Sequence, residues 1–184
     1  MTTSPVLARH PRRNDHQIQY NQWQPWEISS LCQCVTSIKA GDIEGYNHGW
    51  QQLSGLQQLR ALGGMVLACC DLVGQCLRAG VLDPDNADVS VPALERMVEQ
   101  IPENMRMTSE ALLDVIALCG DLSAPNFWAQ VLMDPQRYWA LLMGGYTSIA
   151  SWLAAQSGLS LGTFTQQHLS SMASPELIRV PVAV

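Results

Sequence analysis

Residues 64–79 carry apolar side chains around nearly the whole circumference that a helix would present. The apolar positions are Met65, Val66, Cys69, Cys70, Leu72, Val73, Cys76 and Leu77. A helix that is apolar on nearly all sides has to be surrounded by other elements. We therefore expect residues 64–79 to form a central helix and the rest of the chain to fold around it.

Further stretches show helical spacing of apolar residues together with signals for helix ends. The predicted ranges are 25–40 (Pro25, Gly41), 42–62 (Asp42), 92–100 (Ser90, Pro92), 109–119 (Thr108, Gly120), 135–156 (Asp134, Gly158) and 161–173 (Ser160), with one more short helix from Ser123 and Pro125. Gly80 ends the central helix, and Gly63-Gly64 can break a helix, kink it or let another helix approach closely. Strand signals are confined to VLDP and to IRVPVAV, which Pro181 interrupts. The sequence predicts an all-α fold, a single compact bundle of about seven or eight helices with short loops.

The 184 residues suit one domain with unstructured ends. Residues 1–22 lack periodicity and contain Pro5 and Pro11, so we expect a flexible basic N-terminal arm. Residues 23–174 form the helical domain, and residues 175–184 form an extended C-terminal tail.

Composition narrows the classes of partner. The formal net charge is −6, which disfavours broad binding to the phosphates of nucleic acid. Hydrophobic residues make up 47% and charged residues only 14%, so part of the surface is uncharged and suits a protein partner or self-association. No apolar run follows the first arginines, so we expect a cytoplasmic protein with reduced cysteines. Polar residues interrupt both apolar stretches, 61–79 and 138–155, so we expect no membrane span.

Three groups of residues are candidate metal or catalytic sites, and each lacks part of the arrangement that such a site needs. Cys32 and Cys34 would lie on different sides of a helix, which does not suit zinc. Glu44 and His48 are four residues apart but have no second histidine near them. Residues 83–88 lack the oxygen ligand at position 5, the glycine and the final glutamate of a calcium loop. The sequence therefore indicates no metal, no cofactor and no catalytic residues, although an enzyme or carrier with an apolar ligand pocket between helices stays an alternative.

The residues most typical of a partner-binding surface lie near the N-terminus. Trp23 and Trp26 stand where the arm meets the first helix, and Arg9, Arg12 and Arg13 make the arm basic. Tryptophan and arginine are the residues that most often anchor interfaces. The alternative is that the two tryptophans pin the arm onto the domain. We interpret the chain as a non-enzymatic interaction module, such as an adaptor, inhibitor or accessory or regulatory factor, and its small acidic character would also suit a phage or mobile-element product.

Residues 149–169 give a second functional alternative. Ala154, Gly158 and Phe164 have the spacing of a helix-turn-helix, which makes a DNA-associated regulator conceivable. The side chains that could contact bases are Thr163, Thr165, Gln166 and His168. However, residues 160–172 contain no arginine or lysine to hold phosphates. A helical hairpin capped by glycine explains the same residues.

Overall fold

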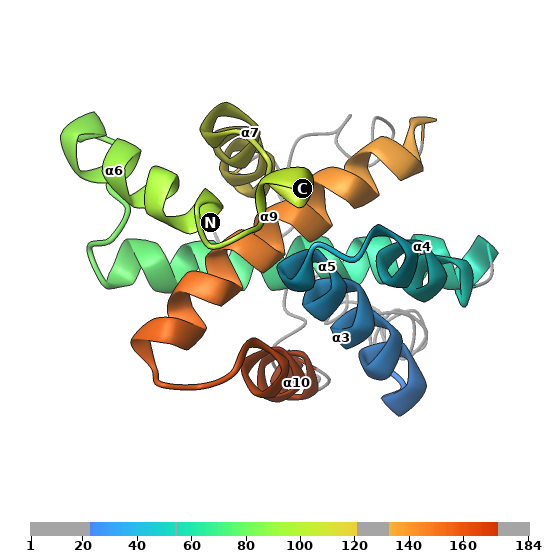
Figure 1. Ribbon diagram of the computed structural model, residues 1–184. Helices are drawn as coiled ribbons and strands as arrows, with labels where there is room; N and C mark the ends of the chain where they lie inside the picture. Colours follow the sequence, from blue (N-terminus) through green and yellow to red (C-terminus); the bar gives the residue numbers. More distant parts are fainter. Residues whose placement is uncertain (1–22, 54, 121–132, 173–184) are drawn as a thin grey trace.

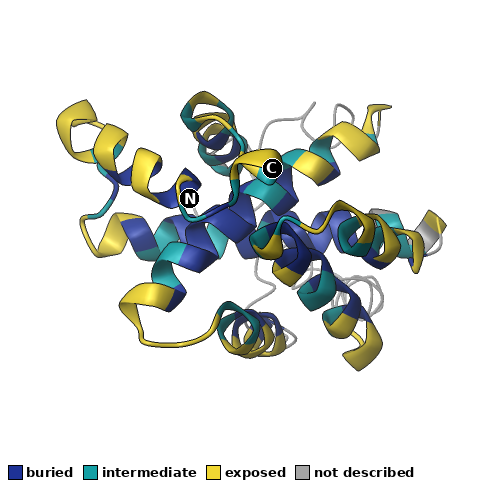
Figure 2. Ribbon diagram, viewed as in Figure 1, coloured by how far each residue is buried: buried dark blue, intermediate teal, exposed yellow. Residues whose placement is uncertain are grey.

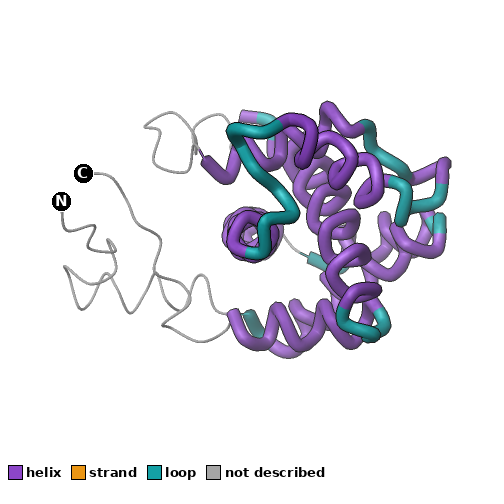
Figure 3. The backbone as a smooth tube through the Cα atoms, turned by 90° about the vertical axis from the view of Figure 1, so that its left-hand side faces the viewer, coloured by secondary structure: helices purple, strands orange, loops and turns teal. Residues whose placement is uncertain are grey.

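The computed structural model describes residues 23–53, 55–120 and 133–172. These residues form seven α-helices and one short 3₁₀ turn, with no strand among them (Figure 3). The elements are α3 (Pro25–Ala40), α4 (Ile43–Gln51), α5 (Gly55–Arg78), α6 (Ala87–Val98), η1 (Glu103–Met105), α7 (Ser109–Gly120), α9 (Pro135–Gln156) and α10 (Leu161–Met172). The predicted all-α class is confirmed. The predicted arm, the tail and the short helix after Ser123 lie outside the described residues.

The two longest helices, α5 and α9, cross at the centre of the molecule (Figure 1). Their facing sides are buried, and the exposed residues lie on the outer helices and toward the ends of α5 and α9 (Figure 2). Leu72 of α5 and Met143 of α9 are fully enclosed, together with Leu31 of α3 and Leu112 of α7. The nearly all-round apolar pattern of residues 64–79 thus marks the centre of the core, as the sequence predicts.

Helix α5 also has the length and composition of a membrane span over residues 60–78, the one such segment among the described residues. Most of it, 61%, is buried inside the domain. The apolar character of α5 is therefore explained by its contacts with α7 and α9.

Several helix ends follow the predicted signals. Gly41, Gly80 and Gly158 have φ values of 72°, 70° and 69°, the left-handed conformation in which glycine commonly follows the end of a helix. At the other ends, Asp42 Oδ1 accepts from the Gly45 amide, and Asp134 Oδ1 accepts from the Arg137 amide. These caps satisfy backbone donors that have no partner within the helix.

Two predicted boundaries are wrong. The helix expected over residues 42–62 ends at Gln51, and α5 already begins at Gly55, so the break lies before Gly63-Gly64. The two glycines sit inside a continuous helix, where the missing side chain of Gly64 makes room for Trp23. Helix α6 begins at Ala87 because Asn86 caps it through the Asp88 amide, which places Pro92 inside the helix.

Candidate interaction surface

The two tryptophans at the start of α3 have opposite environments. Trp23 is only 6% exposed, and its ring lies against the backbone of α5 at Gly64. A β-carbon at Gly64 would lie 2.2 Å from two ring carbons, so the ring requires glycine there. Trp26 is 44% exposed, and of the tryptophans in the described ranges it alone is classed as exposed. Trp23 is therefore a core residue, whereas Trp26 presents its indole to solvent.

A buried carboxylate fixes the start of α3. Glu27 accepts a hydrogen bond from the Gln24 amide at 2.8 Å and pairs with Arg60 of α5 at 3.3 Å. Its side chain is nearly enclosed, and a buried carboxylate is stable only when it is paired in this way. The interactions tie the first turn of α3 to α5 and hold the backbone of Trp26, the neighbouring residue, in one position.

Helix α4 packs closely along α3. A β-carbon at Gly49 would lie 2.6 Å from the Cys34 sulfur and 3.2 Å from the Ser30 carbonyl oxygen, so the two backbones approach as only glycine allows. Near the end of α4, Gln52 Oε1 lies 3.4 Å from the Ser30 hydroxyl. The two antiparallel helices form a continuous outer face that begins at Trp26.

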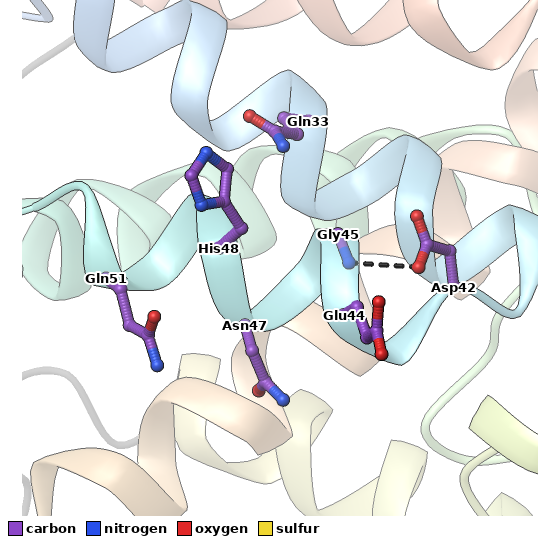
Figure 4. Close-up of a pocket in the computed structure, with 7 residues that line it drawn as sticks. All are labelled: Gln33, Asp42, Glu44, Gly45, Asn47, His48 and Gln51. Atoms are coloured by element: carbon purple, nitrogen blue, oxygen red, sulfur yellow. Dashed lines mark hydrogen bonds between the residues drawn. The ribbon is translucent and has the colours of Figure 1, made fainter.

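This face contains a depression of about 550 Å³ between α3 and α4 (Figure 4). Its lining is polar and consists of Gln33, Asp42, Glu44, Gly45, Asn47, His48 and Gln51. Trp26 and Gln33 are seven residues apart on α3 and so share one face of that helix. We call Trp26 and this depression together the α3–α4 surface: an apolar anchor on the helix face that, two turns later, borders amide and carboxylate groups.

The side chains that line the depression can donate and accept hydrogen bonds. His48 Nε2 lies 2.8 Å from the Gln52 side-chain nitrogen, and Figure 4 shows its ring beside Gln33 rather than beside Glu44. Asp42 is engaged in capping α4. Glu44 and His48 are thus not paired for acid–base chemistry, and no group of three or more potential metal ligands was found among the described residues.

In the acidic turn over residues 83–88, side-chain oxygens accept hydrogen bonds from backbone amides of the same turn. Asp83 Oδ1 accepts from the Asp85 amide, and Asn86 Oδ1 accepts from the Asp88 amide. These bonds shape the connection between α5 and α6.

The predicted binding residues of the arm, Arg9, Arg12 and Arg13, lie outside the described residues. The four residues of the DNA-binding alternative divide between two faces of α10. Thr163 and Gln166 are exposed, whereas Thr165 and His168 are buried against the domain. Only half of the predicted base-contacting set is therefore presented to solvent.

His168 belongs to a polar network that joins three helices. Its Nε2 lies 2.8 Å from Asp71 Oδ2 of α5, and its Nδ1 lies 2.8 Å from the Tyr146 hydroxyl of α9. Gln75 also donates to Asp71 at 2.9 Å. Because a carboxylate only accepts, His168 donates through Nε2. This bond from His168 lowers the pKa of Asp71, so the carboxylate is ionised.

A carboxylate, an imidazole and a hydroxyl in this order are also the parts of a nucleophilic triad. Here the hydroxyl end is closed off, because Tyr146 has no exposed surface and burial raises its pKa well above the usual value. The phenol is held neutral and away from solvent, which suits a brace between helices rather than a nucleophile. Sequence reasoning missed the network, although the charged Asp71 in the apolar middle of α5 was a signal that a partner was needed.

Comparison of the chain with protein-family models, with curated proteins and with solved structures gives no match.

Proposed function

We propose that this chain is a non-enzymatic protein-interaction module that binds a protein partner through the α3–α4 surface, with Trp26 as its anchor. The observation that carries the proposal is the exposure of Trp26 in contrast to the buried Trp23. Burying the exposed part of a large indole is favourable by roughly 1–2 kcal/mol, and a partner that covers Trp26 would gain this free energy. Central aromatic anchors with a polar surround are the usual arrangement at protein interfaces.

The local framework supports the same role. The Glu27–Arg60 pair fixes the first turn of α3, and α4 packs closely on the turns that follow, so a partner need not order this helix. Preorganised side chains bind more tightly because less conformational entropy is lost on association. The arm enters the domain only a few residues before Trp26, so Arg9, Arg12 and Arg13 are close in sequence and can add contacts to an acidic partner.

The alternatives have less support. The DNA-binding alternative loses two of its four candidate side chains, Thr165 and His168, to the core. A ligand carrier needs an apolar pocket, whereas the depression on the α3–α4 surface is lined by polar side chains.

The proposal is tested by capturing partners from an extract of the native host with the tagged full chain, followed by measurement of affinity for the partner obtained. We expect Trp26→Ala to weaken binding by about thirtyfold, the effect of losing an anchor worth about 2 kcal/mol. The free energy of unfolding should change by only about 1 kcal/mol, because nearly half of the side chain is already in solvent.

The matched control is Leu113→Ala on α7, which removes a residue that is 54% exposed and does not belong to the α3–α4 surface. Its affinity should equal that of the wild type. Equal losses in both variants, or no loss in Trp26→Ala, would refute the proposal. Sedimentation equilibrium of the isolated chain shows whether the partner is a second copy.

A further inference from the structure

We propose that Cys70 and Cys119 are a thiol pair that closes to a reversible disulfide between α5 and α7. The proposal is independent of the proposed binding function. It concerns two residues that lie 49 positions apart in the sequence and meet where α7 packs on the middle of α5.

The contact between the two residues is direct. The Cys70 thiol lies 3.9 Å from the Cys119 carbonyl oxygen, so the side chain reaches the backbone of its partner. The two side chains also interact with each other, and a hydrogen bond with the Cys119 thiol is the largest cause that raises the pKa of Cys70. Both residues are half-buried, so a small reagent can reach them. Cys119 is in the last turn of α7. The backbone moves most easily at the end of a helix, so the two sulfur atoms can approach to the bonding distance of a disulfide there.

The other four cysteines differ from this pair. Cys34, Cys69 and Cys76 are buried, so a reagent in solution does not reach their thiols. Buried neutral thiols of this kind are inert packing residues. Cys32 is half-buried like the pair, but no thiol partner for it is found among the described residues, which makes it the natural control.

The chemistry is thiol–disulfide exchange with a small-molecule disulfide such as oxidised glutathione. The Cys119 thiol loses its proton to solvent, and its sulfur attacks one sulfur of the reagent. The reagent's S–S bond breaks, one glutathione thiolate leaves, and a mixed disulfide forms at Cys119. Cys70 then loses its proton and attacks the Cys119 sulfur, which releases the second glutathione. The raised pKa of Cys70 favours this order, because the thiolate is the attacking species.

The net reaction converts two thiols and one reagent disulfide into one protein disulfide and two glutathione thiols. Closure would link the C-terminal end of α7 covalently to the middle of α5. A disulfide removes conformational freedom from the unfolded chain, so the oxidised protein should resist unfolding more than the reduced one.

The test treats the full chain with oxidised glutathione and follows it by intact mass, by peptide mapping and by thermal unfolding. We expect the wild type to lose the mass of two hydrogen atoms, to yield a cross-linked peptide containing Cys70 and Cys119, and to melt several degrees higher. Dithiothreitol should reverse all three changes. Cys32→Ser should behave like the wild type.

Cys70→Ser and Cys119→Ser should not form the cross-link, and Cys119 should carry one glutathione in Cys70→Ser, whereas Cys70 in Cys119→Ser should react more slowly because its pKa is raised. If one variant does not fold, the peptide map of the wild type decides the outcome alone. Glutathione adducts without an internal cross-link in the wild type, or a cross-link that joins other cysteines, would overturn the proposal.

Discussion

At the residue scale, the contact between Trp23 and Gly64 decides how the chain enters the domain. The indole of Trp23 occupies the space that a side chain at Gly64 would fill. Residues that follow in α3, including the exposed Trp26, are placed by this contact and by the pairing of Glu27 with Arg60.

We expect Gly64→Ala to destabilise the protein by about 1–3 kcal/mol, because the added β-carbon would collide with the Trp23 ring. The control is Gly74→Ala in the same helix, where the nearest atom is the flexible end of Arg78 at 3.1 Å. There the better helix propensity of alanine should stabilise the protein by up to about 1 kcal/mol. Urea unfolding measures both, and equal effects in the two variants would contradict the Trp23 contact.

The bond between Asp71 and His168 predicts a dependence of stability on pH. The folded-state pKa of Asp71 is lowered, mainly by the hydrogen bond from His168, and so lies below its unfolded value of about 3.9. The stabilising contribution is therefore present above that unfolded value and is lost as the pH falls through the folded pKa. The side chain is 40% exposed, so solvent screening limits the contribution to about 1 kcal/mol.

Asp71→Asn tests this expectation. At pH 7 it should lower the free energy of unfolding by about 1 kcal/mol relative to the wild type, and the difference should shrink as the pH falls below about 4. Urea unfolding at pH 7 and pH 3 measures the two differences. A difference of the same size at both pH values would mean that the ionised carboxylate is not the source of the stabilisation.

At the element scale, helix ends that depend on local chemistry could be predicted, and those that depend on distant contacts could not. Asp42, Asp134 and Gly158 act within one turn of their helices, and the sequence places them correctly. Gly63-Gly64 indicates a possible break because glycine is unfavourable in helices. The packing of Trp23 against Gly64 explains why the glycine is there although the helix continues.

The candidate surface was predictable only in part for the same reason. Sequence reasoning singled out Trp23 and Trp26 but could not say which is buried, since Gly64 lies 41 positions beyond Trp23. The DNA-binding alternative included Thr165 and His168 as residues that could contact bases, because the sequence does not reveal that His168 is bonded to Asp71, 97 positions away. Hydrophobic periodicity shows which residues share one face of a helix. The burial of Trp23 and His168 depends instead on which helices contact each other.

The contact between α7 and α9 gives a prediction at this scale. A β-carbon at Gly145 would lie 2.8 Å and 2.9 Å from the two methyl carbons of Val115. We expect Gly145→Ala to push the helices apart and to destabilise the protein by about 1–3 kcal/mol. Gly144→Ala, one residue earlier, would meet only the flexible Met107 at 3.4 Å and should be neutral or slightly stabilising. If thermal unfolding ranks the two variants in the opposite order, the packing of α7 on α9 is not as described.

At the scale of the whole molecule, the crossing helices α5 and α9 form the centre of the domain (Figure 1). The α3–α4 surface lies on helices that pack against this centre. Helix α10 is attached to the same centre through the bonds of His168 to Asp71 and Tyr146. The proposed binding surface therefore lies on preorganised helices, and binding should leave the arrangement of the core unchanged.

Hydrogen–deuterium exchange of the full chain, alone and with its captured partner, tests the proposed binding surface most directly. We expect the partner to slow exchange within residues 25–51, which form α3 and α4, and to leave α6 and α7 unchanged. Protection confined to α6 and α7, or the same protection in the complex formed by Trp26→Ala at wild-type affinity, would contradict the assignment of the α3–α4 surface.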